Sequence, residues 1–190
     1  MIMFEKIKGF AFDVDGVFTD GGILAMPDGD LLRQFNAKDC FAARMAVEEG
    51  YKVAIITGGC SNSLINRAMS LGITRENLYL FSKDKAPDLE LFCRRNGLAL
   101  DEVIFAGDDI PDIPAIEAAG IGACPADAVP EVKAAADYIS PYGGGRGCVR
   151  DLVEKVLKAQ GRWNFDPKKP WSGKYPEEIA KFASHGAKRD

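Results

Sequence analysis

Short apolar runs alternate with longer segments of helical periodicity along most of this chain. An apolar run without polar alternation is typical of a strand buried on both faces, and such strands occur in parallel sheets covered by helices. We therefore predict an α/β fold with a doubly wound parallel sheet. The predicted strands cover residues 9–12, 53–56, 78–81, 103–106, 121–124 and 138–140.

Helix-stop signals divide the intervening segments. Glycines at 50, 72, 97 and 161 are expected to end helices over 39–49, 61–72, 86–96 and 148–160, with Ser61 as an N-cap. The last of these has an apolar stripe that is predicted to face the core. It comprises Val149, Leu152, Val153, Val156 and Leu157.

Residues 22–35 interrupt this rhythm with two apolar runs around a Pro-Asp-Gly turn, which predicts a β-hairpin inserted after the first strand. The pattern is lost after Gly161. We therefore expect one domain over residues 1–161 and a C-terminal extension over 162–190 that wraps a surface or a neighbouring subunit.

Composition excludes several classes of catalyst and partner. With 24 Lys and Arg against 28 Asp and Glu, the formal net charge is −4, and the only histidine is His185 near the end. A multi-histidine zinc site is therefore excluded, the composition disfavours a Ser-His-Asp or Cys-His catalyst, and no nucleic-acid partner is expected. No apolar run reaches the roughly 18 to 20 residues that span a bilayer, and no signal-peptide pattern is present, so no membrane partner is expected. Five scattered cysteines without C-x-x-C spacing indicate reduced thiols and a cytoplasmic location.

Polar side chains follow four of the predicted strands at the point where each strand ends. Parallel strands present their carboxyl ends at one edge of a sheet, so we expect these groups to meet there. They are Asp13 and Asp15, then Thr57 and Gly58, then Lys83 and Lys85, and finally Asp108, Asp109 and Asp112.

Carboxylates gathered in this way repel one another, by about 4 kcal/mol per pair at 4 Å and an effective dielectric near 20. Mg²⁺ resolves such a cluster, because it prefers oxygen ligands and needs no histidine. The predicted chemistry is attack by Asp13 on phosphorus to form an aspartyl phosphate. Asp15 protonates the leaving oxygen and later activates water. Thr57 and nearby N–H groups hold the phosphoryl oxygens, and an amine such as Lys85 neutralises them.

These motifs resemble the haloacid dehalogenase superfamily of phosphatases, through DVDGVFTDGG, IITGG, the lysine at 85 and AGDDIPD. FDVDGVFTDGGI, FNAKD and GGGRG resemble its 3-deoxy-D-manno-octulosonate 8-phosphate phosphatase branch, over about residues 10–161. The resemblance implies Asp13 as nucleophile and Asp15 as acid/base, with Thr57 and Lys85 as phosphoryl binders. It also implies Mg²⁺ ligation by the carboxylates of Asp13 and Asp108 and the main-chain carbonyl of Asp15. Asp112 would orient Lys85 or a metal-bound water.

The resemblance further implies a cytoplasmic homotetramer that acts in lipopolysaccharide biosynthesis on a sugar acid phosphate. The lengths between motifs leave no room for a separate cap domain, and the apolar hairpin would pack between subunits. Arg67 matches a basic position that relatives direct toward the sugar acid. Gly59 departs from the charged residue usual in relatives, so a nonulosonate 9-phosphate or another small sugar phosphate is the alternative substrate.

Several readings stay open at this point. Lys83 competes with Lys85, Asp109 either supports the metal site or caps a helix, and Arg67 could be a surface residue. Gly143–Gly147 could cover the site, cradle a phosphate or simply connect two elements. The alternatives of another functional class are a receiver-like phospho-accepting module and a non-catalytic oligomerisation domain. Asp15 argues against the receiver, and the complete set of catalytic groups argues against the idle relative.

Overall fold

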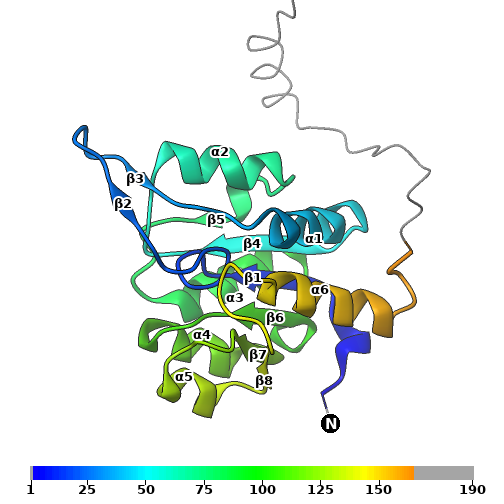
Figure 1. Cartoon of the computed structure of the whole chain (residues 1–190). Helices are drawn as coiled ribbons and strands as arrows, with labels where there is room; N and C mark the ends of the chain where they lie inside the picture. The colour runs from blue at the N-terminus through cyan, green and yellow to red at the C-terminus, as the bar shows by residue number, and fades with distance from the viewer. Residues whose placement is uncertain (1, 165–190) are drawn as a thin grey trace, which may run out of the picture.

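The computed structural model describes residues 2–164. A six-stranded sheet forms its centre, in the order β5-β4-β1-β6-β7-β8 (Figure 1), and every neighbouring pair in it is parallel. All six predicted strands are present, which confirms the doubly wound fold. The strands are β1 (Gly9–Phe12), β4 (Lys52–Ile56), β5 (Leu78–Tyr79), β6 (Val103–Ala106), β7 (Ile121–Cys124) and β8 (Tyr138–Ile139).

Helices cover both faces of this sheet. One apolar core lies beneath α1 (Ala37–Glu48), α2 (Asn62–Ser70) and α6 (Cys148–Ala159). A second lies on the other face, beneath α3 (Lys85–Asn96), α4 (Ile113–Ala118) and α5 (Pro130–Ala135). The predicted apolar stripe of α6 is fully buried in the first core. Four short 3₁₀ turns complete the described elements: Phe4–Lys6, Arg75–Asn77, Leu100–Glu102 and Ile110–Asp112.

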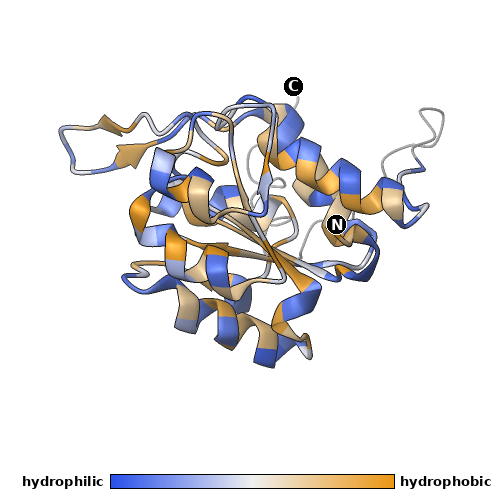
Figure 2. Cartoon of the chain, turned by 90° about the horizontal axis from the view of Figure 1, so that it is seen from below, coloured by the Kyte–Doolittle hydropathy of each residue, from blue (hydrophilic) through white to orange (hydrophobic). Residues whose placement is uncertain are grey.

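The predicted hairpin is present and projects from the body of the molecule (Figures 1 and 2). Its strands β2 (Leu24–Ala25) and β3 (Leu31–Leu32) are antiparallel, with Leu24 opposite Leu32. Leu24 is 62% exposed, so the apolar residues of the hairpin contribute little to the core. Between Asp15 and Thr57 the chain forms this hairpin, α1 and β4, and between Thr57 and Lys85 it forms α2, a 3₁₀ turn and β5. Neither of these two described segments, residues 16–56 and 58–84, therefore contains a cap domain.

Element boundaries differ from the prediction where local contacts intervene. Strand β5 ends at Tyr79 rather than at residue 81, because Phe81 has a left-handed φ of 55°, which an extended strand cannot include. Helix α1 starts two residues early, because Asn36 accepts bonds from the N–H groups of Lys38 and Asp39. Ser61 caps α2 as predicted, by accepting from the N–H of Leu64 at 3.2 Å.

Helix α1 also fixes the glycine-rich loop before α6. Asp39 is completely buried and accepts bonds from the N–H groups of Gly147, at 3.0 Å, and Arg150, at 2.8 Å. Asn36 donates from Nδ2 to the carbonyl of Gly145 at 2.8 Å. Of these two residues of the FNAKD motif, Asp39 therefore caps α6 from a distant part of the chain, and Asn36 anchors the loop before it.

Asp39→Ala is expected to lower the free energy of unfolding by about 1–3 kcal/mol, because it leaves two N–H groups, those of Gly147 and Arg150, without their hydrogen-bond acceptor. Urea denaturation measures the loss. Lys38→Ala, at an exposed position next in the chain, is the control and should change stability by less than about 0.5 kcal/mol. Equal unfolding midpoints for the two variants would contradict the capping role.

Most of the predicted extension, residues 165–190, lies outside the described residues, as does His185. In the described part, residues 2–164, no helix combines the length and apolar character needed to cross a membrane.

Candidate active site

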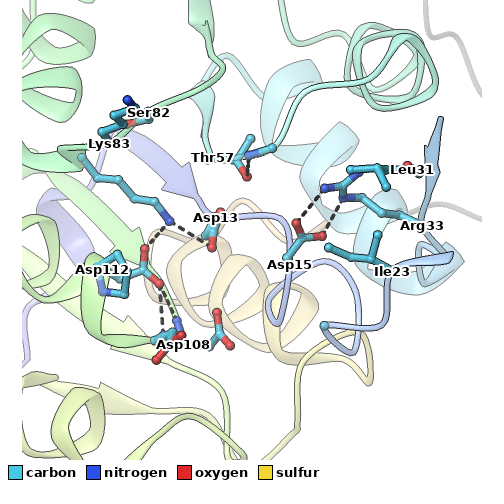
Figure 3. Close-up of a pocket in the computed structure, with 16 residues that line it drawn as sticks. Asp13, Asp15, Ile23, Leu31, Arg33, Thr57, Ser82, Lys83, Asp108 and Asp112 are labelled. Atoms are coloured by element: carbon cyan, nitrogen blue, oxygen red, sulfur yellow. Dashed lines mark hydrogen bonds and ion pairs between the residues drawn. The ribbon is translucent and has the colours of Figure 1, made fainter. Parts of the chain in front are cut away.

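The carboxyl ends of β1, β4 and β6 open into a cavity of about 680 Å³ (Figure 3). It lies beside β1, where the chain crosses from the β4–β5 side of the sheet to the β6 side, which is the usual position of a site in such a fold. Most of the predicted site residues line it. They are Asp13, Asp15, Thr57, Gly58, Lys85, Asp108, Asp109 and Asp112.

Asp13 follows β1 directly and is only 7% exposed. Its N–H donates to the carbonyl of Ala106 at 2.9 Å, which ties it to the end of β6. Its Oδ2 lies 3.0 Å from Nζ of Lys85, whereas its buried Oδ1 has no hydrogen-bond partner among the described residues. Burial raises the pKa of Asp13 to about 6, although Lys85 opposes the shift. One buried oxygen of this carboxylate therefore has no protein group to satisfy it.

Lys85 begins α3 and is 5% exposed. Its ammonium lies between Asp13 and Asp112 and pairs with both. Burial alone would lower the pKa of Lys85, but the two carboxylates outweigh it and raise the pKa. Lys83 lies on the cavity wall and is exposed. Of the two lysines, Lys85 is the one that reaches Asp13.

Asp112 holds this corner together. Its Oδ1 accepts from Lys85, and its Oδ2 accepts from the N–H groups of Asp108, at 2.9 Å, and Asp109, at 3.2 Å. Residue 107 is glycine because any Cβ there would collide with the Asp112 side chain. Asp109 accepts from the N–H of Ile110 at 2.8 Å, so it caps the following 3₁₀ turn. Of the two roles left open for Asp109, the structure therefore shows the capping role.

Thr57 ends β4 and is 1% exposed. Its backbone joins the end of β5, since its N–H donates to Tyr79 at 2.9 Å and its carbonyl accepts from Ser82 at 3.0 Å. Its Oγ1 accepts from the N–H of Gly59 at 3.3 Å, which leaves the hydroxyl hydrogen able to donate to a ligand.

Asp15 is paired with a residue that the sequence patterns did not mark. Arg33, at the end of the hairpin, donates from Nε to Oδ1 of Asp15 at 2.6 Å and from Nη2 to Oδ2 at 2.9 Å. The hairpin is predicted from two apolar runs, and that pattern assigns no role to the one arginine it contains. The available signal was a lone cation in a short apolar hairpin next to an acidic motif.

The carboxylates near Lys85 suit a divalent cation. Asp13, Asp108 and Asp112 can each bring one oxygen within 4.8 Å of the others. Asp112 has both oxygens engaged, so Asp13 and Asp108 are the available ligands. Burial and the neighbouring carboxylates raise the pKa of Asp108 to about 7. Residue 16 is glycine, at a φ of +82°, because a Cβ there would run into Asp108. The unpaired Oδ1 of Asp13 and the carboxylate of Asp108 are therefore suitable oxygen ligands for Mg²⁺.

Comparison with known proteins agrees with this geometry. The family model of haloacid dehalogenase-like hydrolases matches residues 62–147. The 3-deoxy-D-manno-octulosonate 8-phosphate phosphatase of Escherichia coli K12 is 36% identical over 158 residues, which cover 83% of each chain.

Two solved structures are also similar. The phosphatase of the same name from Moraxella catarrhalis, in complex with magnesium, phosphate and KDO, superposes with a TM-score of 0.80 at 32% identity, covering 94% of this chain and 95% of that one. The cobalt-bound enzyme from Haemophilus influenzae has a TM-score of 0.80 at 32% identity, covering 83% and 91%. This chain belongs to the 3-deoxy-D-manno-octulosonate 8-phosphate phosphatase branch of the haloacid dehalogenase superfamily.

Two candidate elements of this phosphatase do not line the cavity of the single chain. Arg67 lies near the Cys40 thiol, where its charge opposes the rise that burial causes in the pKa of Cys40. Gly143–Gly147 pack behind the loop that carries Asp15, where the N–H of Gly145 donates to the carbonyl of Val17 at 2.9 Å. The glycine-rich loop therefore supports the loop that carries Asp15 from outside the cavity.

Mg²⁺ is expected to stabilise the phosphatase more at about pH 7.5 than at about pH 5. Because the pKa values of Asp13 and Asp108 are raised to about 6 and about 7, the metal-free folded state holds protons that the unfolded chain releases above about pH 4. Its stability therefore falls as pH rises from about 4 to about 7. At about pH 7.5 most of these protons have been released and compete little with the cation, and a concentration of 100 Kd adds about 2.7 kcal/mol.

Thermal unfolding with and without Mg²⁺ at the two pH values measures this difference. Asp108→Asn removes one ligand charge and should lose most of the stabilisation. The same melting-temperature increase at both pH values, or in Asp108→Asn, would argue against cation binding at this cluster.

Proposed function

We propose that this phosphatase hydrolyses a sugar acid phosphate with Mg²⁺, through an aspartyl phosphate on Asp13. The observation that carries the proposal is the buried Asp13 carboxylate, with one oxygen paired to Lys85 and the other unpaired. A carboxylate placed in this way can give one oxygen to the cation and attack phosphorus with the other, and the adjacent ammonium lets it approach an anionic ester.

Asp13 forms the bond to phosphorus as the bond to the ester oxygen breaks, and Asp15 gives that oxygen its proton. Asp15 then takes a proton from water, whose oxygen bonds to phosphorus and releases Asp13 and inorganic phosphate. Thr57, the N–H of Gly58 and Lys85 hold the phosphoryl oxygens. When bound by the carboxylates of Asp13 and Asp108 and the carbonyl of Asp15, Mg²⁺ supplies positive charge against the dianionic ester.

The preferred substrate is proposed to be 3-deoxy-D-manno-octulosonate 8-phosphate, the substrate in the names of the relatives in Escherichia coli and Moraxella catarrhalis. A cavity of about 680 Å³ lies within the range of small-molecule sites, roughly 300 to 1,000 Å³. Gly59 on its wall keeps a nonulosonate 9-phosphate or another small sugar phosphate as the second candidate. Arg67 is left out of this assignment because it does not line the cavity.

A panel of sugar phosphates with Mg²⁺ tests the substrate. We expect kcat/KM for octulosonate 8-phosphate to exceed that for hexose phosphates by at least about tenfold, a difference of 1.4 kcal/mol in transition-state binding. Equal values would remove the sugar-acid assignment, and a preference for a nonulosonate 9-phosphate would favour the second candidate. Steady-state turnover of p-nitrophenyl phosphate separates a phosphatase from a receiver-like module, which takes up one phosphoryl group, and from an inert oligomerisation domain.

We also propose a cytoplasmic homotetramer, with residues 1–161 as the catalytic domain and 162–190 as an extension. The apolar side chains of the projecting hairpin support self-association, since Ile23 and Leu24 are 47% and 62% exposed. Five free cysteines support a reducing compartment. Light scattering that gives a single-chain mass for the active enzyme would remove the tetramer.

A further inference from the structure

Arg33 is a buried side chain on an exposed hairpin. Although β2 and β3 project from the body, the Arg33 side chain is only 3% exposed. Its third donor group, Nη1, donates to the carbonyl of Leu31 at 3.0 Å, so all three nitrogens of the guanidinium are hydrogen-bonded. The guanidinium of Arg33 lines the cavity and is hydrogen-bonded there to Asp15.

The Arg33–Asp15 pair has the two parallel N–H to oxygen bonds that fix both position and plane of a carboxylate. Figure 3 shows the Asp15 carboxylate directed at Arg33, on the opposite side of Asp13 from Asp112. Each carboxylate oxygen accepts about two hydrogen bonds. Arg33 therefore leaves one lone-pair position on each oxygen, which can carry the proton that the leaving oxygen needs or accept a hydrogen bond from water.

Gly59 makes the space in which the guanidinium lies. A Cβ on residue 59 would lie 2.6 Å from Nη2 of Arg33, which is too close, and 3.6 Å from Oδ2 of Asp15, which is an ordinary contact. The backbone of Gly59 is not left-handed, so alanine is sterically allowed by the main chain. A single added methyl group would therefore act on the tip of Arg33.

We propose that Arg33 is a positioning residue, which holds the Asp15 carboxylate in place for proton transfer. Gly59 leaves the space that the Arg33 guanidinium occupies. This inference rests on the proposed function and extends it, because the projecting hairpin then contributes a side chain, Arg33, that orients the proposed acid/base. Protonation of the leaving oxygen matters most when the leaving group is a poor one, such as a sugar alkoxide. It matters little for p-nitrophenolate, which departs readily as an anion.

The test compares kcat/KM for p-nitrophenyl phosphate with kcat/KM for the best sugar phosphate of the panel, since kcat/KM covers the steps up to departure of the leaving group. Arg33→Ala should lower kcat/KM about 10²-fold for the sugar phosphate and less than about tenfold for p-nitrophenyl phosphate. Arg33→Lys, which keeps the charge but not the paired bonds, should give an intermediate value. Asp15→Asn should show the same leaving-group dependence, more strongly.

Gly59→Ala supplies an independent arm. It should reproduce the selective loss in the wild-type background and add nothing in the Arg33→Ala background, because its effect acts through Arg33. Arg94→Ala removes an exposed arginine of α3 whose ion pair within the described residues is with Glu90. It serves as the control, and its kinetics on both esters should match those of the wild type. Circular dichroism and melting temperature establish that each variant folds.

Equal losses on both esters, additive effects of the two substitutions, or wild-type kinetics in Arg33→Ala would each overturn the positioning role. Failure of the proposed function is separate and is visible in the wild type, which would then turn over neither ester with Mg²⁺.

Discussion

Asp13→Asn is expected to lower kcat by at least about 10⁴-fold while the protein stays folded. The amide has nearly the same shape as the carboxylate but is not nucleophilic and carries no charge. Asp13 is 7% exposed and lies among other acidic groups, so the substitution also removes repulsion from Asp112 and Asp108. This offsets part of the lost attraction to Lys85, which is why the fold should survive.

Steady-state turnover of p-nitrophenyl phosphate and of the best sugar phosphate measures the effect, with thermal unfolding as the check on the fold. Asp28→Asn, in the exposed turn of the hairpin, is the matched control and should retain wild-type turnover. If Asp13→Asn keeps more than about one hundredth of the wild-type rate, the nucleophile is another group.

Lys85→Ala is expected to cost both activity and stability, because the ammonium serves two buried carboxylates. Its removal leaves Asp13 and Asp112 without their shared cation, a change worth about 3–5 kcal/mol for a broken buried pair. The phosphoryl oxygens also lose a positive charge, so kcat/KM should fall by about 10³-fold, by analogy with the loss of an oxyanion donor.

Lys83→Ala is the comparison that the sequence itself suggests. Lys83 is exposed on the rim of the cavity, and we expect its loss to reduce kcat/KM by less than about tenfold. Urea denaturation and steady-state kinetics on the two variants decide between the lysines. A larger loss of activity in Lys83→Ala than in Lys85→Ala would reverse the assignment.

The sheet could be predicted from the sequence because its signal is local. Strands buried on both faces need continuous apolar runs, and each of the six runs became a strand. The short helices α4 and α5 were missed, since six residues give too little periodicity to separate from a loop. The positive φ of Phe81, which ends β5 early, has no signature in residue type.

The convergence of the polar groups could also be predicted, because the direction of parallel strands brings their carboxyl ends to one edge. The partners of those groups could not. Arg33 is 18 residues from Asp15 in the chain and Asp112 is 27 from Lys85. Such pairings depend on how loops return to the sheet, and no local pattern encodes that path.

The sequence by itself determined the class of fold, the absence of a cap, and the carboxylate, hydroxyl and amine chemistry at the strand ends. These follow from hydrophobic periodicity and from the fixed direction of parallel strands. Only the tertiary structure decided that Lys85 rather than Lys83 meets Asp13, that Asp109 is a cap, and that Arg33 holds Asp15. Those outcomes are set by distances of a few ångströms between segments that pack together only once the cores on both faces of the sheet have formed.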